Sequence, residues 1–503
     1  MPVNPLQSWL TPFKATAAGQ SLCALENLPE ISAQAALQIN SNAVQPGDIF
    51  LALPGVSGHG HRFIQQALAA NAGCVLTDSL ADEDAALAAH PLVIVWPDLL
   101  QVLPALVSAF YHDAVKSLRL VGITGTNGKS STAIFINQLT ELLDGKAAVI
   151  GTLGFGHYQQ LTPLQNTTPH LVELHRIFAT MQSNHVDVAA MEVSSHALVQ
   201  QRVAGLKFET AIFTNLTRDH LDYHGTMEAY GEAKALLFRP EQTRSAVINV
   251  SDDFGKRLAQ RVQVPVMVYG RLSDCHGFAR YLAYDELTSD GHGFDCLLYT
   301  EAGQFNLHIP LLAEFNVQNV LGAMAAMVQL GYSLPAIVEA VAALKAVPGR
   351  MELWQFPGDI SVVVDYAHTP DALQQSLIAL RQQCRGRVWC VFGCGGDRDK
   401  GKRPLMGQIA ELYADHVIIT ADNPRTEDVL TICNDIVAGM KTAAHCQIEP
   451  NRESAIKLAL IEAHANDMIL VAGKGHETYQ ILGQTVREYD ERKFIDALLA
   501  EMS

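Results

Sequence analysis

The sequence lacks the features that would place a chain in a membrane or outside the cell. Its 503 residues contain no apolar run of about 18 residues, the length that a membrane-spanning helix needs. Residues 1–20 have no basic stretch followed by an apolar one, which is the pattern of a secretion signal. We therefore expect a cytoplasmic protein that does not insert into membranes.

Basic runs and paired cysteines are also missing. The formal net charge is −17 and no cluster of lysines and arginines occurs, so we expect no nucleic-acid partner, although local sites for small anions remain open. The nine cysteines are scattered without a CxxC pair, and Cys390 and Cys394 lie in or at the end of an apolar segment. This usage predicts reduced thiols, most of them packed in the core.

What remains is the composition of an ordinary globular protein, 49% hydrophobic and 17% charged, in a chain long enough for roughly three domains. Short β-branched runs alternate with longer amphipathic ones, which predicts an α/β fold with largely parallel sheets. Strands are expected at 118–125, 186–193, 209–216, 245–250, 360–367, 388–395, 416–422 and 468–475. Helices are expected at 129–143, 316–331 and 370–384.

Two breaks in this alternation suggest domain boundaries. A polar stretch at 111–117 precedes the strand at 118–125, and "AVPGRME" (346–352) follows a helix-like run with a Pro-Gly breaker. We therefore predict domains at 1–114, 115–346 and 347–503.

The strongest local motif is "VGITGTNGKSST" (121–132). A glycine-rich loop directly after an apolar strand and directly before a helix lets backbone N–H groups face phosphate oxygens. Lys129 would neutralise phosphate charge and the Ser130 hydroxyl would be available to Mg²⁺. The loop has one residue fewer between its glycines than the usual pattern, and it predicts ATP binding without saying how the ATP is used.

A second segment, "ITADNPRTED" (419–428), admits two interpretations. It is a good strand-to-helix turn, because proline suits the start of a helix and Thr426 and Asp428 suit its N-terminal region. Alternatively, Arg425 contacts a ligand. The segment alone favours the turn.

Further motifs follow the phosphate loop to the C-terminal part of the chain. They are "NTTP" (166–169), "MEVSSHALVQQRV" (191–203), "FTNLTRDHLDYHGTMEAYGEAK" (213–234), "FNVQN" (315–319), "PGRME" (348–352), "DYAHTPDAL" (365–373), "GCGGDRDKGKRPLM" (393–406), "DNPR" (422–425) and "GKGHETYQ" (473–480). In this order the set resembles the Mur ligase family, whose members use ATP to form amide bonds in peptidoglycan precursor synthesis. The family also includes folylpolyglutamate synthetases.

The resemblance implies a three-domain architecture: a UDP-binding N-terminal domain, a central P-loop ligase domain and a Rossmann-like C-terminal domain that binds the amino acid. It implies ATP contacts from Gly125, Thr126, Asn127, Gly128, Lys129, Ser130, Ser131, Asn316, Arg350 and Asp365. On local sequence alone, the last three are equally well a helix cap, a surface charge and a strand-end acid. Because these residues fall on both sides of the boundary at 346, ATP is expected between domains, with domain closure during catalysis.

The resemblance also implies a magnesium site formed by Ser130, Glu192, His220 and Lys234, the last as a carbamate (N6-carboxylysine). Together with Lys129 these residues are the expected catalytic set. Local sequence offers alternatives: a helix N-cap for Glu192, a solvated loop residue for His220, and a helix-surface lysine for Lys234.

The substrates implied are UDP-N-acetylmuramoyl-L-alanyl-D-glutamate and meso-diaminopimelate, since the motifs are most similar to those of the diaminopimelate-adding members. Contacts to the UDP-muramyl dipeptide would come from Ser41, Asn166, Thr167, Thr168, Ser194, Gln200 and Arg202. Contacts to diaminopimelate would come from Arg398, Asp422, Asn423, Pro424, Arg425, Gly473 and Glu477. A guanidinium can bind the extra carboxylate of diaminopimelate with two parallel hydrogen bonds, which lysine cannot satisfy.

The chain departs from the family pattern at three places. Asn40-Ser41-Asn42 replaces the common Asp-Ser-Arg, His59 stands where aspartate is usual, and Ala313 stands where glycine is common. The first two put the uridine contacts in doubt but not the role of the domain.

The expected reaction has two steps. The γ-carboxylate of D-glutamate attacks the γ-phosphate of ATP to give an acyl phosphate and ADP, and the incoming amine then displaces phosphate. A lysine-adding muramyl ligase, a folylpolyglutamate synthetase and a non-catalytic nucleotide-binding module remain as alternatives. A monomer is expected, with a role in cell-wall biogenesis and hence in cell shape, division and the cell cycle.

Overall fold

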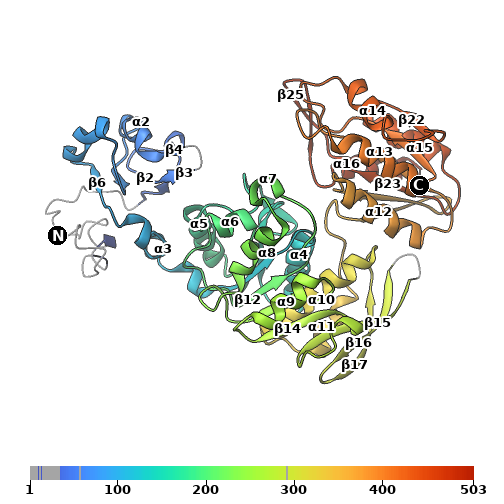
Figure 1. The fold of residues 1–503 in the computed structure, drawn as a ribbon, viewed down its shortest axis with the longest axis horizontal. Coiled ribbons are helices and arrows are strands. Elements are labelled where there is room, and N and C mark those ends of the chain that lie inside the picture. Colours follow the sequence, from blue (N-terminus) through green and yellow to red (C-terminus); the bar gives the residue numbers. More distant parts are fainter. Residues whose placement is uncertain (1–8, 11–12, 14–33, 56–57, 290–292, 503) are drawn as a thin grey trace. The chain divides into compact units, whose positions relative to one another are not determined.

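The structure is a computed structural model that describes residues 9–10, 13, 34–55, 58–289 and 293–502 (Figure 1). The prediction that residues 1–20 are not a secretion signal concerns a segment that lies almost wholly outside the described residues. The chain forms two compact units. One comprises Met1–Gly122, Lys146–Glu209 and His224–Arg244, and the other comprises Ile123–Gly145, Thr210–Tyr223 and Ser245–Ser503.

The first unit begins with a small parallel sheet of order β1-β2-β5-β6. Its strands are β1 (Leu37–Gln38), β2 (Ile49–Ala52), β5 (Cys74–Thr77) and β6 (Val93–Val95), with a hairpin of β3 (Pro54–Gly55) and β4 (Gly58–His59). Its helices are η2 (Ser41–Ala43), η3 (Gly60–Phe63), α2 (Ile64–Ala69), η4 (Asp82–Ala89), α3 (Leu99–Phe110) and η5 (Ala114–Ser117). Apolar side chains of β2 alternate between two cores: Ile49 and Leu51 pack in one, and Phe50 and Ala52 in the other.

The same unit contains a second run of strands in the order β10-β9-β8-β11-β7. They are β7 (Arg119–Thr124), whose last two residues belong to the second unit, β8 (Ala147–Gly151), β9 (Gly154–His157), β10 (Gln160–Thr162) and β11 (Val188–Glu192). The helices of this part are α5 (Leu171–Ser183), α6 (Ser195–Val199), α8 (Met227–Ala235) and η6 (Leu236–Phe238). The pair β8 and β11 is parallel, so both strands end at the same edge.

The second unit contains a run of strands in the order β12-β13-β14-β15-β16-β17, parallel as far as β15 and antiparallel beyond it. They are β12 (Thr210–Phe213), β13 (Ala246–Asn249), β14 (Val266–Arg271), β15 (Tyr281–Ser289), β16 (Phe294–Thr300) and β17 (Gly303–Ile309). The helices are α4 (Lys129–Leu142), α9 (Asp253–Arg261), η7 (Leu272–Asp274), α10 (Glu314–Gln329) and α11 (Leu334–Val341), and α7 (Leu221–His224) ends where the units divide. Helices α4 and α10 pack against each other and are buried over most of their lengths.

The C-terminal part of this unit is a sheet of order β18-β19-β23-β20-β21-β22, parallel except for β18 at one edge (orange to red in Figure 1). Its strands are β18 (Glu352–Phe356), β19 (Ile360–Asp365), β20 (Val388–Phe392), β21 (His416–Ile419), β22 (Cys446–Ile448) and β23 (Met468–Ala472), followed by the hairpin β24 (Tyr479–Leu482) and β25 (Thr485–Glu488). The helices are α12 (Pro370–Gln383), α13 (Lys402–Tyr413), α14 (Val429–Val437), α15 (Arg452–Glu462) and α16 (Glu491–Met502).

Helices cover both faces of this C-terminal sheet. Val363 and Cys390 pack in a core with side chains of α12, α13 and α14, whereas their neighbours Val364 and Val391 pack in another core with α15 and α16. Because successive residues of a strand point to opposite faces, the strands must be apolar at nearly every position. This is the doubly wound arrangement, in which ligands bind at the carboxyl ends of the parallel strands.

The predicted strands and helices all lie where the structure has them, but several predicted strands run too far. β12 ends at Phe213, β20 at Phe392 and β23 at Ala472, each three residues before the predicted end. In each case the chain leaves the sheet and enters a loop with polar or glycine residues. The length of the apolar pattern cannot reveal this exit, because the first loop residues are also small or buried.

Two other predictions from composition can be compared with the described residues. Within them, no helix is both long and apolar enough to cross a membrane. Eight cysteines are described, all of them free thiols and six of them buried, as the core-packing prediction requires. Burial raises the pKa of these thiols, to about 12 for Cys74 and Cys394, so they are poor nucleophiles.

Candidate active site

The phosphate loop takes a conformation that only glycine satisfies at two positions. Gly125 has a φ of 151° and Gly128 a φ of 84°. A Cβ atom on Gly125 would lie 1.8 Å from Thr214 Oγ1, and one on Gly128 would lie 2.3 Å from Asn319 Oδ1. Both glycines are therefore required by close contacts as well as by backbone angles.

Hydrogen bonds fix the loop at the start of α4. The Lys129 ammonium donates to the carbonyls of Gly125 at 3.0 Å and Thr126 at 2.8 Å. The backbone N–H of Asn127 donates to Asn215 Oδ1 at 3.0 Å, and the Thr214 hydroxyl donates to the Asn127 carbonyl at 2.6 Å. Ser130 and Ser131 are buried in the first turn of the helix, whose free N–H groups favour an anion.

Asn316, another residue predicted to contact ATP, is connected to this loop through Asn319, a residue that the sequence analysis did not single out. Asn319, which contacts Gly128 as above, donates through Nδ2 to Asn316 Oδ1 at 3.2 Å. The Asn316 amide donates in turn to the Leu312 carbonyl at 2.8 Å. The helix-cap alternative for Asn316 is wrong, because the N-cap of α10 is Ala313.

Arg350 and Asp365 lie near each other in the C-terminal part of the second unit. The Arg350 guanidinium lies 4.6 Å from the centre of the Tyr366 ring, and its Nε is buried without a hydrogen-bond partner among the described residues. The Asp365 carboxylate accepts from the Met351 N–H at 3.1 Å and from the Ser376 hydroxyl at 2.7 Å. In this structure Asp365 therefore fixes the end of β19, and a role toward ribose stays a prediction.

In the first unit, Glu192 is the last residue of β11. The residue is buried, with 2% of its surface exposed. Its Oε1 accepts from the Thr152 N–H at 2.9 Å and its Oε2 from the Thr152 hydroxyl at 3.3 Å. A Cβ on Gly151 would lie 2.2 Å from Glu192 Oε1, so a larger residue there would displace this carboxylate. The N-cap alternative for Glu192 is wrong, since Ser194 caps α6 through the Ala197 N–H.

Most of the residues predicted for the muramyl dipeptide form one hydrogen-bonded group beside Glu192. The Thr168 hydroxyl donates to the Glu192 carbonyl at 3.0 Å and accepts from the Ser194 N–H at 3.0 Å. Arg202 donates through Nη1 to the Thr168 carbonyl at 2.9 Å and through Nη2 to Gln200 Oε1 at 2.6 Å. Other contacts of this group include the one between the hydroxyls of Thr167 and Thr152, at 3.0 Å. Asn166 lies in the adjoining loop, and Ser41 lies elsewhere, in η2, where its hydroxyl donates to Gln66 Oε1 at 3.1 Å.

Lys234 is buried on α8, only 1% exposed. Its Nζ lies 4.1 Å from the centre of the Tyr230 ring, one helical turn earlier. The Tyr230 ring in turn lies 5.1 Å from that of His224, whose Nε2 is 2.9 Å from the Ser195 hydroxyl. The helix-surface alternative for Lys234 is therefore wrong. Because a buried ammonium is costly, the site favours an uncharged amine or a partner for the charge.

His220 differs from these residues because it lies on the surface. Its side chain is 48% exposed, and its Nε2 is 3.5 Å from Asp219 Oδ2. Its φ of 51° places it in the left-handed region, which is uncommon for histidine. Over the described ranges, no group of three or more His, Cys, Asp or Glu side chains could hold a metal ion.

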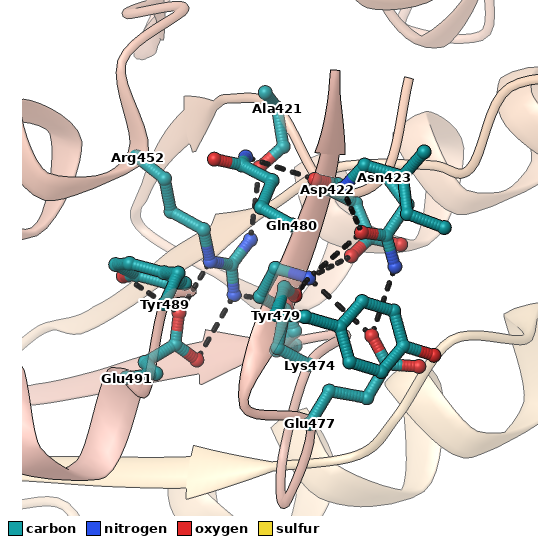
Figure 2. Close-up of polar contacts among 12 residues, drawn as sticks. Ala421, Asp422, Asn423, Arg452, Lys474, Glu477, Tyr479, Gln480, Tyr489 and Glu491 are labelled. Carbon is teal, nitrogen blue, oxygen red and sulfur yellow. Dashed lines mark hydrogen bonds and ion pairs between the residues drawn. The ribbon is translucent and has the colours of Figure 1, made fainter. Parts of the chain in front are cut away.

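The residues predicted for the amino acid lie in loops that follow β20, β21 and β23. Figure 2 shows three of them, Asp422, Asn423 and Glu477. Asn423 is 3% exposed and its Nδ2 donates to Glu477 Oε2 at 2.8 Å. Its Oδ1 accepts from the Lys474 ammonium at 3.1 Å and from the Ile481 N–H at 3.0 Å. Asp422 precedes it, with its carbonyl bound by Gln480 at 2.9 Å.

Arg425 follows Pro424 with a φ of 52°, a left-handed backbone. Its main chain pairs with the β24–β25 hairpin, because its N–H donates to the Ile481 carbonyl at 3.1 Å and its carbonyl accepts from Gly483 at 2.7 Å. Its Nη1 donates to the carbonyls of Gly396 at 2.9 Å and Asn423 at 3.4 Å. The turn interpretation also holds, since Asp428 caps α14 through the Thr431 N–H.

The remaining predicted residues of this pocket lie in the same loops. Arg398 donates through Nη1 to the carbonyl of Asp397 at 3.1 Å. A Cβ on Gly395 would contact both Arg425 Nη1, at 3.0 Å, and Arg398 Cγ, at 3.8 Å, so both arginines flank that glycine. Gly473 has a φ of 114° and starts the loop that carries Lys474 and Glu477.

Sequence reasoning missed four residues that hold these sites. Thr152 binds Glu192, Asn319 joins Asn316 to the phosphate loop, Tyr366 stacks on Arg350, and Lys474 joins Asn423 to Glu477. Three of the four, all except Thr152, lie inside motifs already recognised, "FNVQN", "DYAHTPDAL" and "GKGHETYQ". Their position in those motifs was the available signal.

The chain is similar to known proteins over most of its length. Three family models match in succession: "Mur ligase family, catalytic domain" at residues 35–111, "Mur ligase middle domain" at 123–327, and "Mur ligase, glutamate ligase domain" at 349–475. The chain is 42% identical over 480 residues to the UDP-N-acetylmuramoyl-L-alanyl-D-glutamate–2,6-diaminopimelate ligase of Haemophilus influenzae strain PittEE, covering 94% of this chain and 98% of that one.

Solved structures agree with this. One of a UDP-N-acetylmuramoyl-L-alanyl-D-glutamate–2,6-diaminopimelate ligase is 35% identical, with a TM-score of 0.68, and covers 93% of this chain and 94% of its own. A folylpolyglutamate synthase of Mycobacterium tuberculosis is 19% identical, with a TM-score of 0.58 over 75% of this chain and 95% of its own, and shares the fold alone. The predicted α/β, three-domain fold class is confirmed. With three matching models and a relative that covers nearly its whole length, the chain belongs to the Mur ligase family.

Proposed function

We propose that this protein joins meso-diaminopimelate to UDP-N-acetylmuramoyl-L-alanyl-D-glutamate, using ATP and releasing ADP and phosphate. The observation that carries the proposal is the group of side chains at the carboxyl ends of β20, β21 and β23, where Arg425 and Glu477 present opposite charges around Asn423. An amino acid with an ammonium and a carboxylate at its far end fits such a pair. The 42% identical relative, whose name gives the same two substrates, supports this assignment.

The reaction has two steps. The γ-carboxylate of the D-glutamate attacks the γ-phosphorus of ATP, the bond to the β–γ bridging oxygen breaks, and ADP leaves with that electron pair. The amine of diaminopimelate then attacks the acyl carbon, phosphate leaves, and the amine loses a proton. The chain provides Lys129 and the N–H groups at the start of α4 for the phosphates, so its task is to position the reactants and offset their charge.

Magnesium belongs to the proposal as the ion that offsets phosphate charge. Mg²⁺ is usually bound through one or two carboxylates, substrate phosphates and water, all oxygen donors. By their chemistry, the buried Glu192 carboxylate and the Ser130 hydroxyl are each donors of this kind, and His220 is a further candidate.

Lys234 is proposed as the carbamylated residue. Its neutral amine forms a bond to the carbon of CO₂, one carbon–oxygen electron pair moves onto oxygen, and the nitrogen releases a proton to solvent. Two things support this: the side chain is buried on α8, and its position matches that of the family's carbamylated lysine.

The proposal keeps the three predicted domains, 1–114, 115–346 and 347–503, and places the UDP group on the first of them with Ser41. It further includes a monomer in the cytoplasm and a role in cell-wall synthesis, and through it in cell shape and division. A folylpolyglutamate synthetase has less support, since that comparison reaches 19% identity only. The lysine-adding alternative would differ from the proposed diaminopimelate-adding ligase mainly in the residues around the amino acid, so the choice of acceptor distinguishes the two.

The deciding experiment is phosphate release with ATP and the UDP-muramyl dipeptide, with either diaminopimelate or lysine as acceptor. Stimulation by diaminopimelate far above lysine is expected. Equal or greater stimulation by lysine would favour the lysine-adding alternative, and no stimulation by either, with ATP bound, would reject the ligase assignment. A folate substrate in the same assay tests the folylpolyglutamate alternative.

A further inference from the structure

The ammonium of Lys474 lies among Asn423, Glu477 and Tyr479 (Figure 2), and the residue is completely buried. It donates to the Tyr479 carbonyl at 2.8 Å, to Asn423 Oδ1 at 3.1 Å and to Glu477 Oε2 at 3.3 Å. Asp422 Oδ1 lies 3.5 Å away as an additional ion-pair partner. A lysine has three N–H donors, and three acceptors of the protein already take them. Lys474 therefore has no donor left for a substrate.

These contacts fix the orientation of the Asn423 amide. Its Oδ1 receives two donors, the Lys474 ammonium and the Ile481 N–H at 3.0 Å. A flipped amide would point its NH₂ group at both of these donors, so the flip is excluded. The Nδ2 must then face Glu477 Oε2, at 2.8 Å.

The same contacts divide the Glu477 carboxylate into two unlike oxygens. Oε2 accepts from both Asn423 and Lys474. Within the described part of the chain, no hydrogen bond or ion pair reaches Oε1, and the side chain is 17% exposed. The Lys474 ammonium is shared between two carboxylates, those of Asp422 and Glu477. Glu477 Oε1 is thus the oxygen that remains for a positively charged ligand group.

A second buried cation contacts the same loops in a different way. Arg452, paired with Glu491, donates through Nη2 to the Ala472 carbonyl at 2.8 Å and through Nη1 to the Ala421 carbonyl at 3.4 Å (Figure 2). These carbonyls immediately precede the loops that begin at Asp422 and Gly473. Arg452 therefore anchors the backbone of the pocket, while Lys474 sets the side chains.

We propose that Lys474 is a positioning residue for the amino-acid site: by holding Asn423 and Glu477 it turns Glu477 Oε1 toward the ammonium of the incoming amino acid, without contacting that amino acid. This inference rests on the proposed function. Loss of Lys474 should therefore weaken the binding of the amino acid alone, because ATP and the UDP-muramyl dipeptide have no part in these contacts.

The test uses the full-length protein and Lys474→Met, whose side chain is one atom shorter and has no donor. With diaminopimelate varied, its KM should rise about 10- to 100-fold while kcat changes less than about threefold, because charge-assisted hydrogen bonds that orient a binding group are lost. The KM values of ATP and the UDP-muramyl dipeptide should stay within about twofold. If Lys474→Met does not fold, Lys474→Gln, which has a donor without the charge, replaces it with the same expectations.

The matched control is Arg387→Met. Arg387 binds Asp467 at 3.0 Å, just before β23 begins, whereas Lys474 lies just after β23 ends. This variant removes a cation from the opposite edge of the same sheet. It should lower the temperature of unfolding and leave the KM of diaminopimelate unchanged.

A double-mutant cycle with Glu477→Gln separates positioning from general weakening. If Lys474 acts through Glu477, the double variant should raise the KM of diaminopimelate by no more than about threefold over the worse single variant. The inference would be overturned if the increases in KM of the two single variants multiplied in the double variant, or if Lys474→Met left the KM of diaminopimelate unchanged. Equal increases in KM for all three substrates would also overturn it. If the wild-type protein shows no release stimulated by diaminopimelate, the proposed function fails and the inference with it. If the wild type is stimulated and Lys474→Met behaves like it, only the inference fails.

Discussion

Replacing Arg425 by alanine tests how the pocket recognises the second carboxylate of diaminopimelate. In the structure, Nη1 is occupied by the carbonyls of Gly396 and Asn423. Within the described residues, Nε and Nη2 have no hydrogen-bond partner, and these two donors lie side by side on a guanidinium. A carboxylate can accept from both at once. Lysine, which lacks this carboxylate, would leave them unused.

The size of the effect follows from these two donors. A hydrogen bond to a charged group contributes about 1.5–3 kcal/mol, and the partial exposure of Arg425 lowers the total for the pair to about 2–3 kcal/mol. This corresponds to a rise of about 30- to 150-fold in the KM of diaminopimelate. Arginine and alanine both bear the cost of the left-handed backbone at this position, so backbone strain does not enter the comparison.

The assay is phosphate release with diaminopimelate or lysine varied at saturating ATP and UDP-muramyl dipeptide. Arg425→Ala should lose its preference for diaminopimelate over lysine by the same factor, and Arg425→Lys should lose less. The control is Thr426→Val, which removes the hydroxyl bound to Asp397 at 2.8 Å in the same loop but keeps the guanidinium. A loss of ATP affinity as large as that for diaminopimelate, or an equal loss of lysine use, would refute the reasoning.

Three further predictions concern other parts of the chain. Lys234→Ala should be nearly inactive in phosphate release and partly restored by short carboxylates such as acetate, and full activity without them would contradict the carbamate. Ala313, buried with a φ of 70°, should tolerate glycine with a change of less than about 1 kcal/mol in the free energy of unfolding. Valine there should cost about 3 kcal/mol in urea unfolding, and an unaffected variant would show that the backbone angle is not strained. Hydrogen bonds from the Arg403 side chain lower the pKa of Glu427 from 4.5 to about 2, so its contribution to stability is complete above pH 4.5 and disappears as the pH falls toward 2. The stability difference between wild type and Glu427→Gln, measured by urea unfolding, should therefore shrink over that interval, and a difference that stays constant would argue against the pairing.

Local patterns in the sequence were sufficient for the eight strands and three helices that were predicted and for the phosphate loop. The alternation of β-branched and amphipathic runs located the strands and helices, because the C-terminal strands are buried on both faces and must be apolar throughout. The loop glycines were recognisable because Gly125 and Gly128 take backbone angles that other residues avoid. These are constraints between near neighbours.

The contacts inside the pockets could not be predicted in this way. Asn423 and Lys474 are separated by 51 positions, with two helices and two strands between them, so nothing local shows that they meet. Lys234 lies in "GEAKA", whose composition suits a helix surface, and its burial depends on the packing of α8. The family resemblance supplied the expected roles of such residues, but it did not supply the residues that hold them in place, such as Thr152 and Lys474.

Helices cover both faces of the C-terminal sheet, so the residues that make the domain fold and the residues proposed to bind the amino acid lie in different segments of the sequence. Its strands carry the residues that make the domain fold, and the loops at 393–398, 422–425 and 473–477 carry those proposed to choose the amino acid. Exchange of these loops for those of a ligase with a different acceptor would therefore alter selectivity while the strands between the helices keep their packing. In this domain, a change of substrate does not require a change of core.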